Sequence, residues 1–149
     1  MTLDDGLNLG ELITNKEYSD QNDQLFNLYK YKGKKTLIFV SMHCVRCIEL
    51  LPEIRTARLP HTSVIIFSTG NQEDCEQLDE FFQRKVKIVS ITSEQMEEDF
   101  SVATHPFCIV VDECQQVCNK GTVYTGKDLL ELVNVNGERK RKKLFSNLF

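Results

Sequence analysis

The sequence has no tryptophan, only three prolines and no long apolar run among its 149 residues. A transmembrane helix needs about 20 consecutive apolar residues, so the pattern predicts no membrane span. The N-terminus, MTLDDGLNLGELI, carries acidic residues where a signal peptide has basic ones, and no apolar core segment follows them. We therefore expect a cytoplasmic protein, in a compartment that keeps most thiols reduced.

The chain also lacks a strong overall charge, because 18 basic and 22 acidic side chains leave a net charge of -4. The basic residues are unevenly placed, and residues 139–143 read RKRKK. An acidic body without a basic face argues against a nucleic-acid partner. For residues 138–149 two hypotheses remain: a flexible, solvated end, or a peripheral contact with an anionic membrane through the basic cluster and the apolar residues after it.

A chain of this length with 41% hydrophobic and 27% charged residues is typical of one compact domain. Apolar, β-branched runs predict strands, and apolar residues at helical spacing predict helices. The expected elements are a strand at 36–40, a helix at 44–57 interrupted by Pro52, a strand at 63–68, a helix at 73–84, a strand at 86–91, a helix at 93–100, strands at 107–112 and 116–124, and a helix at 127–133. This order predicts a mixed sheet, with a parallel β-α-β-α-β part and a final antiparallel hairpin.

The same pattern divides the chain into three parts. Residues 1–35 are polar and irregular, and we expect an N-terminal extension of one strand and one short helix that packs on the fold. Residues 36–133 form the main α/β domain. Residues 134–149 form the basic tail.

Two of the six cysteines carry the strongest chemical signal. Cys44 and Cys47 form a C-x-x-C pair between a predicted buried strand and a helix. Free N–H groups and the positive end of the helix dipole favour a thiolate at Cys44, and a thiolate is the nucleophile of disulfide exchange. Cys47 lies one turn later on the same helix face, so it can resolve a mixed disulfide.

Four segments together resemble the thioredoxin superfamily, and more closely its TlpA, ResA and MauD-like branch of thiol-disulfide oxidoreductases. They are GKKTLIFV at residues 33–40, CVRC at residues 44–47, Pro52, and ATHP at residues 103–106 before a strand. The resemblance spans residues 33–133 and implies an α/β thioredoxin fold. It also implies that Thr104, His105 and Pro106 form a cis-proline loop that packs against the dithiol and pairs with an extended substrate.

The resemblance implies a reaction without a cofactor or a metal. Its expected partners are a protein or peptide with cysteine thiols or a disulfide, and a redox partner that recycles the dithiol. The chain also faintly resembles thioredoxin-like proteins associated with the bacterial sporulation killing factor. That likeness implies a dedicated client, such as a secreted antimicrobial peptide.

The sequence departs from the family pattern near the dithiol. His43 replaces the tryptophan that often precedes the first cysteine, and the apolar Ile38 and Leu50 stand where relatives carry an acid. His43 and His105 are the remaining candidates for proton handling. Inside the pair, Val45 and Arg46 are expected to tune the thiol, because the Arg46 charge favours a thiolate at Cys44.

The remaining cysteines leave other hypotheses open. Cys75 and Cys108 are most simply apolar filler, whereas Cys114 and Cys118 lie where a hairpin could join them in a second disulfide. The two C-x-x-C-like pairs could instead hold zinc. The alternative to an oxidoreductase is then a thioredoxin-fold binding or scaffold module with inert or zinc-bound cysteines. A peroxidase is a weaker alternative.

Overall fold

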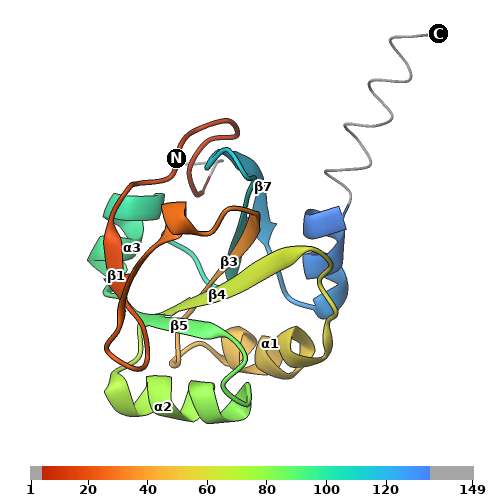
Figure 1. The fold of residues 1–149 in the computed structure, drawn as a ribbon. Coiled ribbons are helices and arrows are strands. Elements are labelled where there is room, and N and C mark those ends of the chain that lie inside the picture. The colour runs from red at the N-terminus through yellow and green to blue at the C-terminus, as the bar shows by residue number, and fades with distance from the viewer. Residues whose placement is uncertain (1–4, 135–149) are drawn as a thin grey trace, which may run out of the picture.

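The computed structural model describes residues 5–134, so the basic tail after residue 134 and its expected membrane contact lie outside the described residues. A five-stranded mixed sheet with the order β5-β4-β3-β6-β7 forms the centre (Figure 1). Its strands are β3 (Lys34–Val40), β4 (Thr62–Ser68), β5 (Lys87–Ser90), β6 (Phe107–Val111) and β7 (Val117–Thr122). Strand β4 is parallel to β3 and β5, whereas β6 is antiparallel to β3 and β7. The predicted mixed α/β sheet is confirmed.

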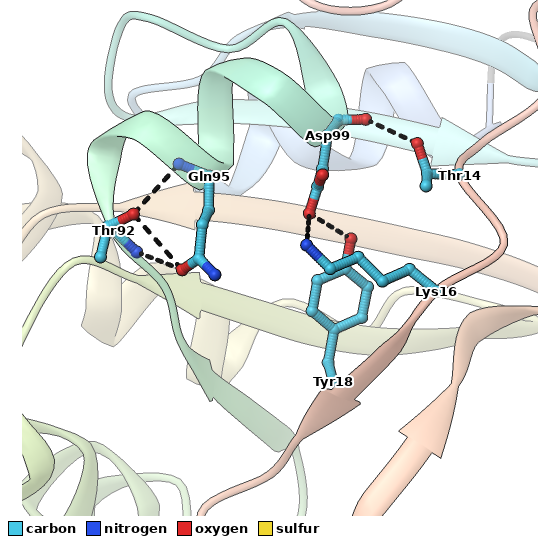
Figure 2. A network of polar contacts seen from close by, with 6 residues as sticks. All are labelled: Thr14, Lys16, Tyr18, Thr92, Gln95 and Asp99. Atoms are coloured by element: carbon cyan, nitrogen blue, oxygen red, sulfur yellow. Dashed lines mark hydrogen bonds and ion pairs between the residues drawn. The ribbon is translucent and has the colours of Figure 1, made fainter.

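The helices also follow the predicted order. They are α1 (Val45–Thr56), α2 (Gln72–Phe81) and α3 (Ser93–Phe100), and residues 126–134 are helical as well. The start of α3 is fixed by a capping box, in which Thr92 and Gln95 each accept a hydrogen bond from the other's backbone N–H (Figure 2). No helix in residues 5–134 is long and apolar enough to cross a membrane.

Strand β3 separates two apolar clusters, because its alternating side chains point to opposite faces of the sheet. Ile38 and Val40 join α1, α2 and the helical residues 126–134 in the first cluster. Leu37 and Phe39 join α3 and the N-terminal segment in the second cluster. Figure 1 shows α1 and α2 together on one side of the sheet.

The N-terminal segment crosses the second face and reaches both edges of the sheet. It contains a short antiparallel pair, β1 (Glu17–Ser19) and β2 (Leu25–Asn27), followed by the 3-10 helix η1 (Leu28–Lys30). Isolated bridges join Leu12 to Gln116 next to β7 and Asp20 to Val89 in β5. The prediction of a single strand in this segment was wrong, because three-residue strands are too short to show a period of two.

A polar network ties the N-terminal segment to the end of α3 (Figure 2). Asp99 accepts hydrogen bonds from the Lys16 ammonium at 3.0 Å and from the Tyr18 hydroxyl at 2.9 Å, and its backbone carbonyl accepts one from Thr14 at 3.3 Å. Burial raises the pKa of Tyr18, and the hydrogen bond to Asp99 raises it further. The phenol therefore remains a donor to the carboxylate.

We predict that the N-terminal segment contributes directly to the stability of the whole domain. Leu28 is 0% exposed and Leu25 is 69% exposed, although they lie three positions apart. Leu28→Ala should lower the free energy of unfolding by about 2 to 5 kcal/mol, because it opens a cavity in the core. The matched change Leu25→Ala should stay within about 0.5 kcal/mol. Urea unfolding of both variants measures the difference, and equal effects would show that the segment is not part of the core.

Candidate active site

The first cysteine of the pair occupies the junction between β3 and α1. Cys44 is the N-cap of α1, and its sulfur accepts a hydrogen bond from the backbone N–H of Cys47 at 3.3 Å. The sequence places it there because β3 is buried along its length and the helical residues begin at Val45. Cys44 is partly exposed, so a reagent or client can reach its sulfur.

The second cysteine lies inside the protein. Cys47 is 1% exposed, and its sulfur accepts a hydrogen bond from the backbone N–H of Ser41 at 3.4 Å. Burial raises its pKa to about 12, with further increases from the hydrogen bond to Cys44 and from the charge there, while the Ser41 N–H opposes the shift. Cys47 therefore stays a thiol when Cys44 is ionised.

The pKa of Cys44 is lowered below that of a free cysteine, as the sequence predicts. Burial is the largest single effect and opposes ionisation, but several donors together outweigh it. The Cys47 thiol comes first among them, followed by the backbone N–H groups of Cys47 and Arg46 and then by the Arg46 charge. The dithiol is thus asymmetric, with one accessible, acidic thiol and one buried, weakly acidic thiol.

The loop before β6 reaches the dithiol from another part of the chain. The His105–Pro106 peptide bond is cis, as the family resemblance implies. The Cys44 thiol points to the backbone carbonyl of His105, with 4.0 Å between sulfur and oxygen. Pro106 is buried, whereas Thr104 is exposed and His105 partly exposed. The structure therefore brings the predicted dithiol and the predicted proline loop together.

The side chains around the dithiol offer few titrating groups. Ile38 and Leu50 are both 0% exposed and share the apolar cluster of Cys47. These two positions therefore provide no group beside the dithiol that could take up or release a proton. Glu49 is exposed, and so is His43. Burial lowers the pKa of His105, and the negative charge of Asp5 partly opposes that shift. His105 is therefore largely a neutral imidazole at neutral pH.

The Arg46 charge lowers the Cys44 pKa, as the sequence predicts, and the Arg46 side chain also packs over an aromatic ring. Its guanidinium carbon lies 4.8 Å from the centre of the Tyr124 ring, and these two residues line a hollow of about 300 Å³ together with Glu49. The Arg46 charge is the smallest of the effects that lower the Cys44 pKa. Tyr124 is missed because the sequence predicts a strand through residue 124, whereas β7 ends at Thr122.

Solved structures resemble the fold of this chain, among them three that each cover most of its length. The thioredoxin domain of a thiol-disulfide oxidoreductase from Bacteroides vulgatus has a TM-score of 0.69 and 20% identity, over 86% of this chain and 99% of that one. A DsbF homologue from Corynebacterium diphtheriae has a TM-score of 0.72 and 10% identity, over 85% and 87%. The peroxidoxin BcpB from Mycobacterium tuberculosis has a TM-score of 0.68 and 13% identity, over 85% and 96%. The chain has a thioredoxin fold. No family model matches it, and no curated protein matches it by sequence.

The other four cysteines lie outside the junction of β3 and α1 that carries the dithiol. Cys75 and Cys108 are buried in the first cluster, and burial raises the pKa of both thiols. Cys114 is exposed and Cys118 is partly buried, and no disulfide joins the two. Within residues 5–134, no group of three or more histidine, cysteine and acidic side chains could hold a metal ion.

We predict that hydrogen bonding controls the acidity of Cys44 more than the Arg46 charge does. Cys47→Ala should raise the Cys44 pKa, because it removes the strongest donor to the thiolate. Arg46→Gln should raise it less, because the guanidinium rests on Tyr124. The rate of alkylation by iodoacetamide against pH gives both values. A larger shift in Arg46→Gln than in Cys47→Ala would reverse this ranking.

Proposed function

We propose that the protein is a thiol-disulfide oxidoreductase, with Cys44 as the nucleophile and Cys47 as the resolving thiol. The observation that carries the proposal is the asymmetry of the pair, since Cys44 is accessible with a lowered pKa and Cys47 is buried with a pKa of about 12. A dithiol in which both sulfurs were buried would not reach a client. One in which both were acidic would place two negative charges side by side.

In the reducing direction, the Cys44 thiolate attacks one sulfur of a client disulfide. A bond forms between Cys44 and the client, the client's S–S bond breaks, and the other client sulfur leaves as a thiolate. Cys47 then gives up its proton and attacks the Cys44 sulfur, which closes the Cys44–Cys47 disulfide and releases the second client sulfur. Two electrons and the Cys47 proton pass to the client, and its second sulfur takes a proton from water, which balances the proton that Cys44 lost to water when it ionised. The oxidising direction is the reverse.

The surroundings of Cys47 support this order of events. Burial and the Cys44 thiolate both raise the Cys47 pKa, but Cys44 loses its charge once it is bonded to the client. The Cys47 proton then becomes easier to remove, and the departing client thiolate is the base nearest to the reacting sulfurs. Because Ile38 and Leu50 supply no acid, this account requires no carboxylate at the site.

The client in this proposal is a protein or peptide that presents an extended segment to Thr104 and His105. The exposed Thr104 and partly exposed His105 lie beside the sulfur that the client must reach. The sequence resemblance favours one dedicated client, such as a secreted antimicrobial peptide, together with a separate protein that recycles the dithiol. No cofactor enters any step.

Mixed-disulfide trapping tests the assignment of the two cysteines. Cys47→Ser should accumulate a disulfide between Cys44 and a client peptide, because the intermediate loses its internal exit. Cys44→Ser should accumulate none at the Cys44–Cys47 site, since the Cys47 thiol is buried. Non-reducing gels with mass spectrometry detect the adduct. If wild-type protein exchanges no disulfide and neither variant traps one, the chain is a thioredoxin-fold binding module instead.

The stabilised thiolate also predicts the direction of exchange. Potentials on this scaffold depend largely on how well the reduced thiolate is stabilised, and thioredoxin itself lies at about -270 mV. The donors around Cys44 favour the reduced form, so the couple should be less reducing than thioredoxin. Equilibration with glutathione buffers measures the potential. A value at or below that of thioredoxin would identify the protein as a reductant.

A further inference from the structure

One carboxylate from the N-terminal segment holds the loop that carries His105. The two oxygens of Asp5 accept hydrogen bonds from the backbone N–H of Ala103 at 2.9 Å and from that of Thr104 at 3.0 Å. The Thr104 hydroxyl donates to the same carboxylate at 2.5 Å. These bonds join positions 98 and 99 residues apart, and they lie immediately before the carbonyl that the Cys44 thiol contacts.

The residue after Asp5 is equally well fixed. Gly6 donates its backbone N–H to the Ser101 carbonyl at 2.7 Å and has a φ of +84°. A side chain at this position would lie 2.7 Å from the Phe107 ring, which leaves no room for a Cβ atom. Residues 5 and 6 therefore contact the loop on both sides of His105 and Pro106.

A second anchor lies just upstream of the loop. Lys16, Tyr18 and Thr14 hold Asp99 at the end of α3 (Figure 2). The N-terminal segment thus contacts the chain from Asp99 to Thr104 at both ends. His105, whose carbonyl faces the Cys44 thiol, directly follows these anchored residues.

We propose that Asp5 is a positioning residue for client binding, which acts by holding the loop of Thr104, His105 and Pro106 against Cys44. This inference rests on the proposed function, because it concerns the same site. Ala103 and Thr104 are exposed, so water replaces the carboxylate when it is removed and the fold survives. What is lost is the fixed conformation of the loop, and with it the orientation of the backbone that pairs with an extended client.

Asp20, which lies beside the edge strand β5, provides a matched control. Asp20 also accepts two backbone N–H bonds, from Asn22 at 2.8 Å and Gln24 at 3.0 Å, and it also binds a third donor, the Lys87 ammonium, at 2.9 Å. Asp5→Asn and Asp20→Asn therefore remove the same kind of charge and the same kind of acceptor from the same N-terminal segment. Only the first change touches the loop beside Cys44.

The test compares these two variants with the wild type in three measurements. Asp5→Asn should raise the KM for a peptide disulfide about tenfold, the loss expected for one charge-assisted hydrogen bond. It should also speed hydrogen exchange at the Ala103 or Thr104 amide, because an Asn NH₂ group now faces one of these N–H groups. The rate of Cys44 alkylation by iodoacetamide, which needs no client contact, should stay unchanged. Asp20→Asn should match the wild type in all three.

Two results would overturn the proposal: a wild-type KM with wild-type amide exchange in Asp5→Asn, or an equal rise in KM in Asp20→Asn. The second result would mean that any loosening of the N-terminal segment has the same effect. A wild-type protein that exchanges no disulfide would defeat the proposed function alone. Hydrogen exchange at the Ala103 and Thr104 amides then decides the role of Asp5. Faster exchange in Asp5→Asn but not in Asp20→Asn supports positioning, and unchanged exchange in Asp5→Asn refutes it.

Discussion

The burial of β3 on both faces is the constraint on which the rest of the structure depends. Its side chains from Lys35 to Val40 are all buried, so the strand cannot shift or rotate without disturbing both apolar clusters. The helix after it must then begin at a fixed point, and Cys44 is the N-cap at that point. The sulfur therefore receives the Cys47 N–H as a direct result of core packing, with no separate device to orient it.

The same packing produces the difference between the two thiols. One helical turn after Cys44, the chain enters the cluster of Ile38 and Leu50, and Cys47 lies in that cluster. Desolvation is the largest effect on its pKa, whereas hydrogen-bond donors outweigh desolvation at Cys44. An acid at position 38 or 50 would supply a proton acceptor but would also oppose the thiolate. This chain has neither effect, and in the proposed mechanism the departing client sulfur takes the Cys47 proton.

Local signals predict the main domain well and the N-terminal segment poorly. Helix α3 has the predicted bounds of 93–100, because the Thr92–Gln95 capping box and the apolar spacing agree. The position of Cys44 also follows from neighbouring residues. By contrast, Asp5 binds residues almost a hundred positions away, and the Arg46 guanidinium packs over the Tyr124 ring. Such contacts form only when distant segments meet in the folded chain, so the residues next to Asp5 or Arg46 in the sequence cannot predict them.

The position of Asp5 also explains how so short a segment can hold a loop. Leu7, two residues later, is 7% exposed within the second apolar cluster, and Gly6 between them is fixed against Ser101 and Phe107. The carboxylate is therefore anchored by its own neighbours before it binds the loop. Because its conformational freedom is already lost on folding, its hydrogen bonds restrain Ala103 and Thr104 at little further entropic cost. The burial of Leu7 thus helps to fix Asp5, and Asp5 in turn holds the loop beside the dithiol in one conformation.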